Sequence, residues 1–210
     1  MGRKENGKVF EDTEKILMQK KWSNEIGKKC YGSGLIALSG RNDEKLTFYS
    51  MELCKLLHEE NHGKILYFSL KYYIQEIMQK YPDIPYHIDD TAGMEMDELY
   101  RKVRAISNDV PIRLIVIDEL PLLLWGKENL TRMEEMERIT TRLKCISEEL
   151  KIPVLVLLPL SKYTAKDYSV LDELRGYGNI ESLLKVIAYI DEKGSGCHVR
   201  IIKDESKKMI

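Results

Sequence analysis

The 210-residue sequence has little of several features that assign a protein to a specialised class. Its four cysteines lie far apart without any Cys-x-x-Cys pair, which disfavours a disulfide framework and a zinc site. No apolar run reaches the roughly 18 to 20 residues that cross a bilayer. The net charge is -1, from 33 basic and 34 acidic residues, so the overall basic excess that would favour nucleic acid is absent. We therefore expect a cytoplasmic globular protein with free thiols and no membrane partner.

What the chain does contain is an alternation of apolar and amphipathic segments. The hydrophobic fraction of 43% and the length suit one well-buried α/β domain. We expect strands at 35–39, 64–69, 86–88, 112–118, 154–158, 186–191 and 198–203. We expect helices at 47–60, 70–81, 94–108 and 130–150, with helical fragments at 171–174 and 180–183. This alternation predicts a mainly parallel, doubly wound sheet with helices on both faces.

The N-terminal part follows a different pattern. Apolar residues in 9–22 recur at near-helical spacing, which predicts an amphipathic helix ahead of a glycine-containing turn. We therefore divide the chain into a linker-like helix and turn at 1–30 and a single α/β domain at 31–210.

Two segments together have the outline of a nucleotide site. Leu114–Asp118 is an apolar run closed by a carboxylate, the position of a Mg²⁺-binding aspartate in P-loop proteins. Upstream, Leu35–Thr47 has the strand, the turn after Gly40 and the helix start of a phosphate-binding unit. Thr47 would be the second Mg²⁺ ligand there.

The sequence of the loop itself opposes phosphate binding. Where a P-loop has Gly-Lys-Ser/Thr, this chain has Lys45-Leu46-Thr47. Lys45 adds bulk at the glycine position, and Leu46 offers no donor to an outer phosphate. Asp43 and Glu44 add negative charge where a polyanion would lie. The alternative, that Lys45 swings across to replace the missing lysine, stays open.

Further motifs extend the pattern along the chain. They are Tyr67-Phe68-Ser69-Leu70, Ile88-Asp89-Asp90-Thr91, Glu98-Leu99, Leu114–Asp118, Ile139-Thr140, Glu149–Val154, Leu160-Ser161-Lys162 and the segment from Leu171 to Glu181. In order and in spacing, from about Trp22 to Lys203, they resemble the C-terminal motor domain of DnaB-type replicative DNA helicases. The resemblance implies a RecA-like P-loop NTPase fold, and in the family it goes with ATP-dependent DNA unwinding.

The differences from the family pattern fall on its chemistry. Lys71 stands where the family has the glutamate thought to activate water, and Pro159 where it has a glutamine that senses the γ-phosphate. Glu205 replaces the arginine of a Lys-x-Arg pair that reaches a neighbouring subunit's ATP. The resemblance leaves Arg41, Lys45, Thr47, Asp118 and Lys203 as nucleotide-binding residues if any nucleotide binds, with Arg175 also retained.

DNA contact is left open by the sequence. In the resembled family two loops touch the DNA backbone, and they correspond here to about 125–131 and 162–168. Lys127, Lys162 and Lys166 are the DNA-binding candidates, but Glu128 and Asp167 in the same loops nearly balance them.

Three functions follow as hypotheses. The first is a catalytically inactive relative of the helicase domain that binds DNA, a replicative helicase or another replisome protein. The second is an active ring-type replicative DNA helicase with a rearranged P-loop, which would need Mg-ATP. The third is an interaction module without a replication role. Under the first we expect no cofactor and at most weak self-association, without a stable hexamer.

Overall fold

A seven-stranded sheet forms the centre of the computed structural model, which describes residues 24–60, 63–82, 87–126, 129–161, 169–193 and 196–205. The strands are β1 (Gly34–Gly40), β2 (Lys64–Ser69), β3 (His87–Asp89), β4 (Ile112–Asp118), β5 (Pro153–Pro159), β6 (Leu184–Lys193) and β7 (Gly196–Asp204). Their order across the sheet is β3-β2-β4-β5-β1-β6-β7. Among the pairings of the described strands, only β6–β7 is antiparallel, so the predicted mainly parallel sheet is confirmed.

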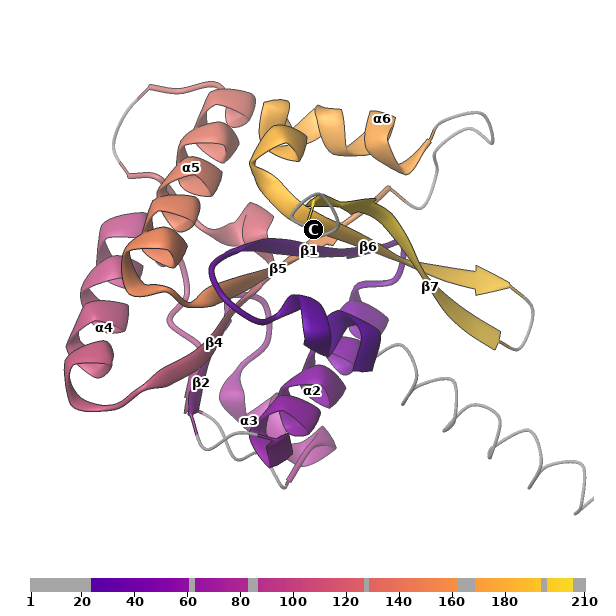
Figure 1. Ribbon diagram of the computed structural model, residues 1–210. Coiled ribbons are helices and arrows are strands. Elements are labelled where there is room, and N and C mark those ends of the chain that lie inside the picture. Colours follow the sequence, from indigo (N-terminus) through magenta and orange to yellow (C-terminus); the bar gives the residue numbers. More distant parts are fainter. Residues whose placement is uncertain are drawn as a thin grey trace, which may run out of the picture.

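Helices cover both faces of this sheet (Figure 1). The α-helices are α2 (Asp43–Glu60), α3 (Ile74–Lys80), α4 (Met96–Asp109), α5 (Arg132–Leu150) and α6 (Val170–Leu174). Short 3-10 helices are η1 (Leu120–Leu122), η2 (Arg175–Tyr177) and η3 (Asn179–Leu183). In Figure 1, α2 and α3 lie on one side of the sheet and α4, α5 and α6 on the other, which confirms the doubly wound arrangement.

The apolar strands are explained by burial on both faces. Along β4, Leu114 and Val116 pack in the cluster under α2, whereas Ile115 and Ile117 pack in the cluster under α4 and α5. A strand that is covered on both sides needs apolar residues at successive positions instead of alternate ones. This is why the continuous apolar runs predicted the central strands well.

The beginning of the described chain packs onto the domain. Residues 24–29 are helical, and Ile26 and Cys30 are buried in the same cluster as Leu53 and Leu57 of α2. The helix predicted at 9–22 lies outside the described residues, so the proposed boundary at residue 30 stays a prediction. Cys30, Cys54 and Cys145 are free thiols. No helix in the described ranges is long and apolar enough to span a membrane.

Two helix starts differ from the sequence prediction by four residues, and both lie at the same edge of the sheet. The first helix begins at Asp43 instead of Thr47, because Asn42 caps it. The next helix begins at Ile74 instead of Leu70. The backbone N–H of Leu70 donates to the Asp118 carbonyl at 2.6 Å, so this residue extends the β2–β4 contact and does not start a helix.

Candidate nucleotide site

The candidate site lies at the carboxyl edge of the parallel strands, where open α/β sheets bind their ligands. Thr47 lies in the helix after β1, Lys71 follows β2, Asp118 ends β4 and Pro159 ends β5. The sheet therefore brings the ends of four predicted segments to one edge, as the sequence required.

The segment that would cradle phosphate is mostly helix. Only Arg41 and Asn42 separate the end of β1 from the start of α2. The side chain of Asn42 accepts a hydrogen bond from the Lys45 backbone N–H (3.2 Å). The backbone carbonyl of Asn42 accepts one from the backbone N–H of Leu46 (3.1 Å). A phosphate-binding loop needs backbone N–H groups that point at the ligand. Here the N–H groups of Lys45 and Leu46 are bonded within the helix.

Leu46, at the position of the P-loop lysine, is a core residue. Its side chain has no exposed surface and packs in the cluster between α2 and the sheet. A Cβ atom added to Gly40 would lie 3.3 Å from Leu46 Cδ2 and 3.4 Å from the Cβ of Ile190. The leucine therefore fills the space directly beside the end of β1.

Asp118 lies in a buried network of hydroxyl groups. Its Oδ2 accepts hydrogen bonds from Thr47 Oγ1 (2.8 Å) and from the Tyr67 hydroxyl (2.6 Å). Ser50 Oγ lies 2.8 Å from that tyrosine oxygen and donates to the carbonyl of Thr47. Oδ1 of Asp118 is buried without a hydrogen-bond partner in the described part of the chain. The network joins α2 to the ends of β2 and β4.

Burial dominates the electrostatics of this network. It raises the pKa of Asp118 to about 6, although the hydrogen bonds from Tyr67 and Thr47 act in the opposite direction. Burial, and next the charge of Asp118, also raise the pKa of the Tyr67 hydroxyl well above its ordinary value. This phenol therefore remains a neutral hydrogen-bond donor.

Sequence reasoning missed Tyr67 and Ser50 as partners of Asp118. A signal for the tyrosine was present, because the hydroxyl group of a tyrosine in a buried strand usually finds a hydrogen-bond partner. No sequence pattern singled out Ser50, since its contact with Tyr67 depends on how α2 packs on β2.

Lys71 connects three segments of the same edge. Its Nζ lies 2.5 Å from Oδ2 of Asp43, at the start of α2, and 2.7 Å from Oε1 of Glu119, after β4. Burial lowers the pKa of Lys71, but the hydrogen bonds to Asp43 and Glu119 outweigh it and the net shift is upward. The side chain is therefore a firmly charged ammonium group between two carboxylates. Glu119, only 7% exposed, was not singled out from the sequence.

Arg41 and Pro159 form a second set of contacts at this edge. The guanidinium of Arg41 pairs with both carboxylate oxygens of Glu173 in α6 and donates to the carbonyl of Ser161. The hydrogen bond to Glu173 is the main cause of the raised pKa of Arg41. Pro159 offers only its carbonyl, which accepts from the Tyr177 hydroxyl at 2.6 Å. Both predicted residues are thus used in contacts within the chain.

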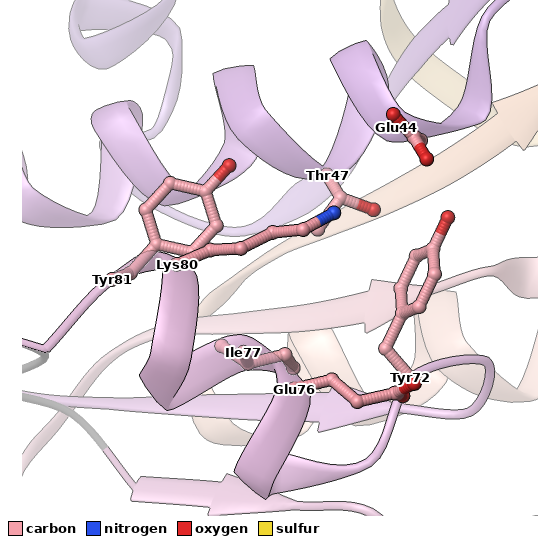
Figure 2. Close-up of a pocket in the computed structure, with 7 residues that line it drawn as sticks. All are labelled: Glu44, Thr47, Tyr72, Glu76, Ile77, Lys80 and Tyr81. Carbon is pink, nitrogen blue, oxygen red and sulfur yellow. The ribbon is translucent and has the colours of Figure 1, made fainter.

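A pocket opens beside Thr47, between α2 and α3 (Figure 2). It is lined by Glu44, Thr47, Tyr72, Glu76, Ile77, Lys80 and Tyr81. Its volume of about 310 Å³ includes its open mouth, and the ammonium of Lys80 lies 6.0 Å from the centre of the Tyr72 ring. Figure 2 shows the Lys80 side chain reaching past Tyr81 towards Thr47. A lysine of the chain therefore extends into the space next to the retained threonine.

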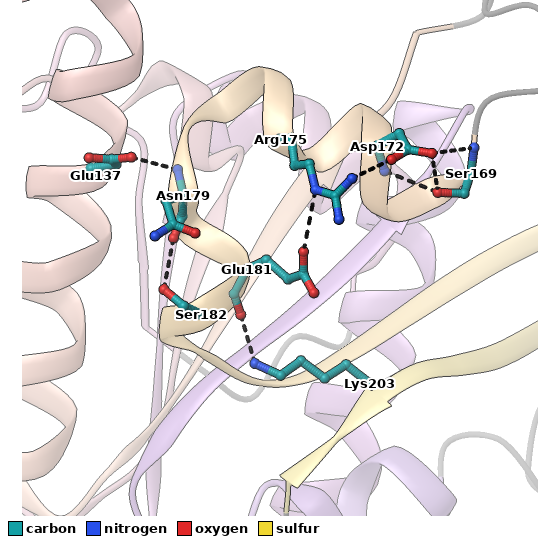
Figure 3. Close-up of polar contacts among 8 residues, drawn as sticks. All are labelled: Glu137, Ser169, Asp172, Arg175, Asn179, Glu181, Ser182 and Lys203. Atoms are coloured by element: carbon teal, nitrogen blue, oxygen red, sulfur yellow. Dashed lines mark hydrogen bonds and ion pairs between the residues drawn. The ribbon is translucent and has the colours of Figure 1, made fainter.

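Lys203 and Arg175 belong to a different cluster (Figure 3). Lys203 donates to the carbonyl of Glu181 (2.8 Å) and pairs with the carboxylate of Glu205 (2.9 Å). Arg175 is 65% exposed and pairs with Asp172 at 2.5 Å. Among the contacts of the described residues, none joins this cluster to Thr47, Asp118 or Lys71. The predicted nucleotide residues are thus divided between two places.

Lys127, Lys162 and Lys166, the DNA-binding candidates, lie outside the described residues. Within the described ranges, no group of three or more His, Cys, Asp or Glu side chains could hold a metal ion. Thr47 and Asp118, the predicted Mg²⁺ ligands, do lie together.

The fold and the paired Thr47 and Asp118 place the protein in the class of RecA-like α/β domains. Comparison with known families narrows this class. The chain belongs to the family of the DnaB-like helicase C terminal domain, whose profile matches residues 33–201. This confirms the family resemblance drawn from the motifs.

Individual relatives agree with the family. The replicative DNA helicase DnaB of Leifsonia xyli is 29% identical over 116 residues, 54% of this chain and 25% of that protein. The replicative DNA helicase DnaC of Bacillus subtilis is 30% identical over 108 residues, 50% of this chain and 24% of that protein. The aligned segment thus spans about a quarter of the length of these relatives.

Solved structures support the fold. A DnaB-like replicative helicase, described with its interactions with primase, superposes with a TM-score of 0.73 at 18% identity, over 82% of this chain and 52% of that chain. The ATPase domain of G40P superposes with a TM-score of 0.70 at 20% identity, over 82% of this chain and 78% of that chain. The predicted RecA-like fold is confirmed by these matches.

Proposed function

We propose that this chain is a DnaB-family domain that neither binds nor hydrolyses ATP and acts by binding DNA, a replicative helicase or another replication protein. The observation that carries the proposal is the start of α2 at Asp43, with Leu46 in the core. In a helix that begins here, the N–H groups of Lys45 and Leu46 are bonded to Asn42. The segment then provides neither a loop around phosphate nor a lysine at position 46 for the outer phosphates.

Charge at the start of α2 supports the same conclusion. Asp43 and Glu44 lie in the first turn, where acidic side chains stabilise the positive end of the helix dipole. That end would otherwise attract an anionic phosphate. The carboxylates therefore take over the electrostatic role of the ligand.

Thr47 and Asp118 are the residues that would have to hold Mg²⁺ bound with ATP. A carboxylate and a hydroxyl are suitable ligands for this ion. However, the Oδ2 atom of Asp118 already accepts two hydrogen bonds, one of them from Tyr67, which packs directly on it. We infer that this arrangement, together with the buried leucine at position 46, does not suit Mg-ATP.

We expect a low rate of ATP hydrolysis, because the family's lysine, glutamate and arginine are all replaced in this chain. Removing one electrostatic stabiliser of a transition state costs about 10²- to 10³-fold in rate, and an arginine finger contributes about 10³ to 10⁵. Such losses need not multiply, since groups that act as a unit are non-additive. With the lysine, the glutamate and the arginine positions all changed, retention of Asp118 does not restore catalysis.

An active helicase is the second candidate, and one observation favours it. Thr47 and Asp118 are in hydrogen-bond contact at 2.8 Å, as two ligands of one metal ion would be placed. Under this alternative, Mg-ATP would have to unwind the first turn of α2 and displace Lys71. An interaction module without a replication role is the third, and the relatives, which are replicative helicases, favour a replication role over it.

Nucleotide assays separate the first two candidates. We expect no binding of a fluorescent ATP analogue with Mg²⁺ at millimolar concentration, and no phosphate release with or without single-stranded DNA. A DNA-stimulated ATPase activity that is lost in Asp118→Ala would overturn the proposal and establish the active helicase.

DNA and protein partners need separate assays. Titration with fluorescent single-stranded DNA should show salt-dependent binding if DNA is the partner. In that case Lys162→Ala combined with Lys166→Ala weakens binding to all sequences alike, whereas the control Lys55→Ala on α2 does not. Capture of a purified replicative helicase without DNA would assign a protein partner instead. Failure of both assays would favour the third candidate.

A further inference from the structure

We propose that the ammonium group of Lys71 is a built-in cation that takes the place of a dissociable divalent ion at this edge of the sheet. The inference deepens the proposed function and depends on it, because it explains how the site is closed to Mg²⁺. The chain would then fold independently of divalent cations.

The ammonium group of Lys71 lies between two parts of the chain. It makes contact with carboxylates from two separate segments, Asp43 at 2.5 Å and Glu119 at 2.7 Å. Glu119 directly follows Asp118, which has one buried oxygen without a hydrogen-bond partner among the described residues. Acidic side chains from the start of α2 and the end of β4 therefore surround a single positive group.

The positive charge of Lys71 balances the negative charges of Asp43 and Glu119. Asp43 and Glu119 both contact the same nitrogen, so without it two negative groups would face each other in a partly buried place. Two carboxylates that both lie within hydrogen-bond distance of one nitrogen repel each other, and the repulsion is stronger where water is partly excluded. The burial of Glu119 makes a compensating cation necessary, and Lys71 provides it from inside the chain.

The place that the Lys71 ammonium occupies is accessible from solution. The side chains of Lys71 and Asp43 are 27% and 31% exposed, so the position lies at the surface and an ion from solution can reach it. Mg²⁺ and Mn²⁺ are commonly held by one or two carboxylates together with water. With Lys71 shortened to a neutral side chain, Asp43 and Glu119 become such a pair.

The test removes the tethered cation and supplies a free one. Wild type, Lys71→Met and Lys71→Arg are titrated with Mn²⁺ without nucleotide, with free Mn²⁺ followed by electron paramagnetic resonance and unfolding by thermal scans. We expect Lys71→Met to bind one Mn²⁺, with a melting temperature raised by about 3 to 6 °C at ten times the dissociation constant. Wild type and Lys71→Arg should bind none at the same concentration.

Further variants assign the bound ion to this place. Adding Asp43→Asn to Lys71→Met should abolish the Mn²⁺ binding, whereas Lys55→Met, which removes an exposed lysine of α2, should create none. Lys71→Gln is a second neutral variant that keeps a polar group at the surface, and it should behave as Lys71→Met does if the latter does not fold.

Two results would overturn the inference. One is Mn²⁺ binding by wild type that Glu119→Gln abolishes, because the position would then be open to a free ion. The other is a folded neutral variant of Lys71 that binds no Mn²⁺. ATP binding by wild type, measured separately, would contradict the proposed function but would leave these metal titrations interpretable.

Discussion

Restoring the missing P-loop lysine should damage the fold and not repair the site. In Leu46→Lys, a side chain with no exposed surface is replaced by one that carries an ammonium group. The buried leucine contributes about 1.5 to 3 kcal/mol through the hydrophobic effect. Keeping a lysine neutral at pH 7, below its ordinary pKa near 10.4, costs about 4 to 5 kcal/mol. Because the lysine can bend towards the surface near the start of α2, we expect a net loss of about 3 to 5 kcal/mol.

Urea unfolding followed by circular dichroism measures this loss. Leu46→Met is the matched control, since an unbranched apolar side chain of similar volume usually costs less than about 1.5 kcal/mol. We expect the lysine variant to gain no affinity for Mg-ATP. A loss of stability below that of the methionine variant, together with new ATP binding, would show that position 46 faces an open loop and would refute the reasoning.

Three further predictions concern the buried network and the packing beside it. Tyr67→Phe removes a hydrogen bond to Asp118, and we expect a loss of about 1 to 3 kcal/mol in urea unfolding; a loss no larger than that of Tyr72→Phe, which lies outside the network, would contradict its role. The pKa of Asp118, about 6 in the folded state, lies above the unfolded value, so its ionisation favours unfolding. Wild type should therefore lose stability relative to Asp118→Asn as the pH rises from about 4 to about 6, by up to about 3 kcal/mol, and a pH-independent difference would refute this. Gly40→Ala places a methyl group against Leu46 and should cost about 1 to 3 kcal/mol; adding Leu46→Ala should relieve part of that cost, and strict additivity of the two changes would contradict the contact.

The sequence predicted the sheet well for a simple physical reason. Strands covered on both faces must be apolar throughout, so the runs at β1, β4 and β5 stood out, and the segments between them carried helical periodicity. The start of α2 was predicted four residues too late, at Thr47 instead of Asp43. Asn42, Asp43 and Glu44 form a normal helix start, with an N-cap residue followed by acidic residues. The later start at Thr47 was predicted because this segment is a loop in the resembled family, although the local signal favours a helix start at Asp43.

The contacts of the candidate site were only partly predictable. The pairing of Thr47 with Asp118 followed from the motif positions. The contact of Lys71 with Asp43 and Glu119 did not, because it depends on how three distant segments meet at one edge of the sheet. The same holds for Arg41, whose partner Glu173 lies far along the chain in α6. Substitutions at family positions were visible in the sequence, but their new partners required the structure.

A crystal structure of the protein soaked with Mg²⁺ and a non-hydrolysable ATP analogue tests the central claim most directly. We predict that no density for phosphates is present at the end of β1, that α2 still begins at Asp43, and that Leu46 remains buried. Phosphate density enclosed by residues 41–46 in a loop, with a metal ion between Thr47 and Asp118, would contradict the account.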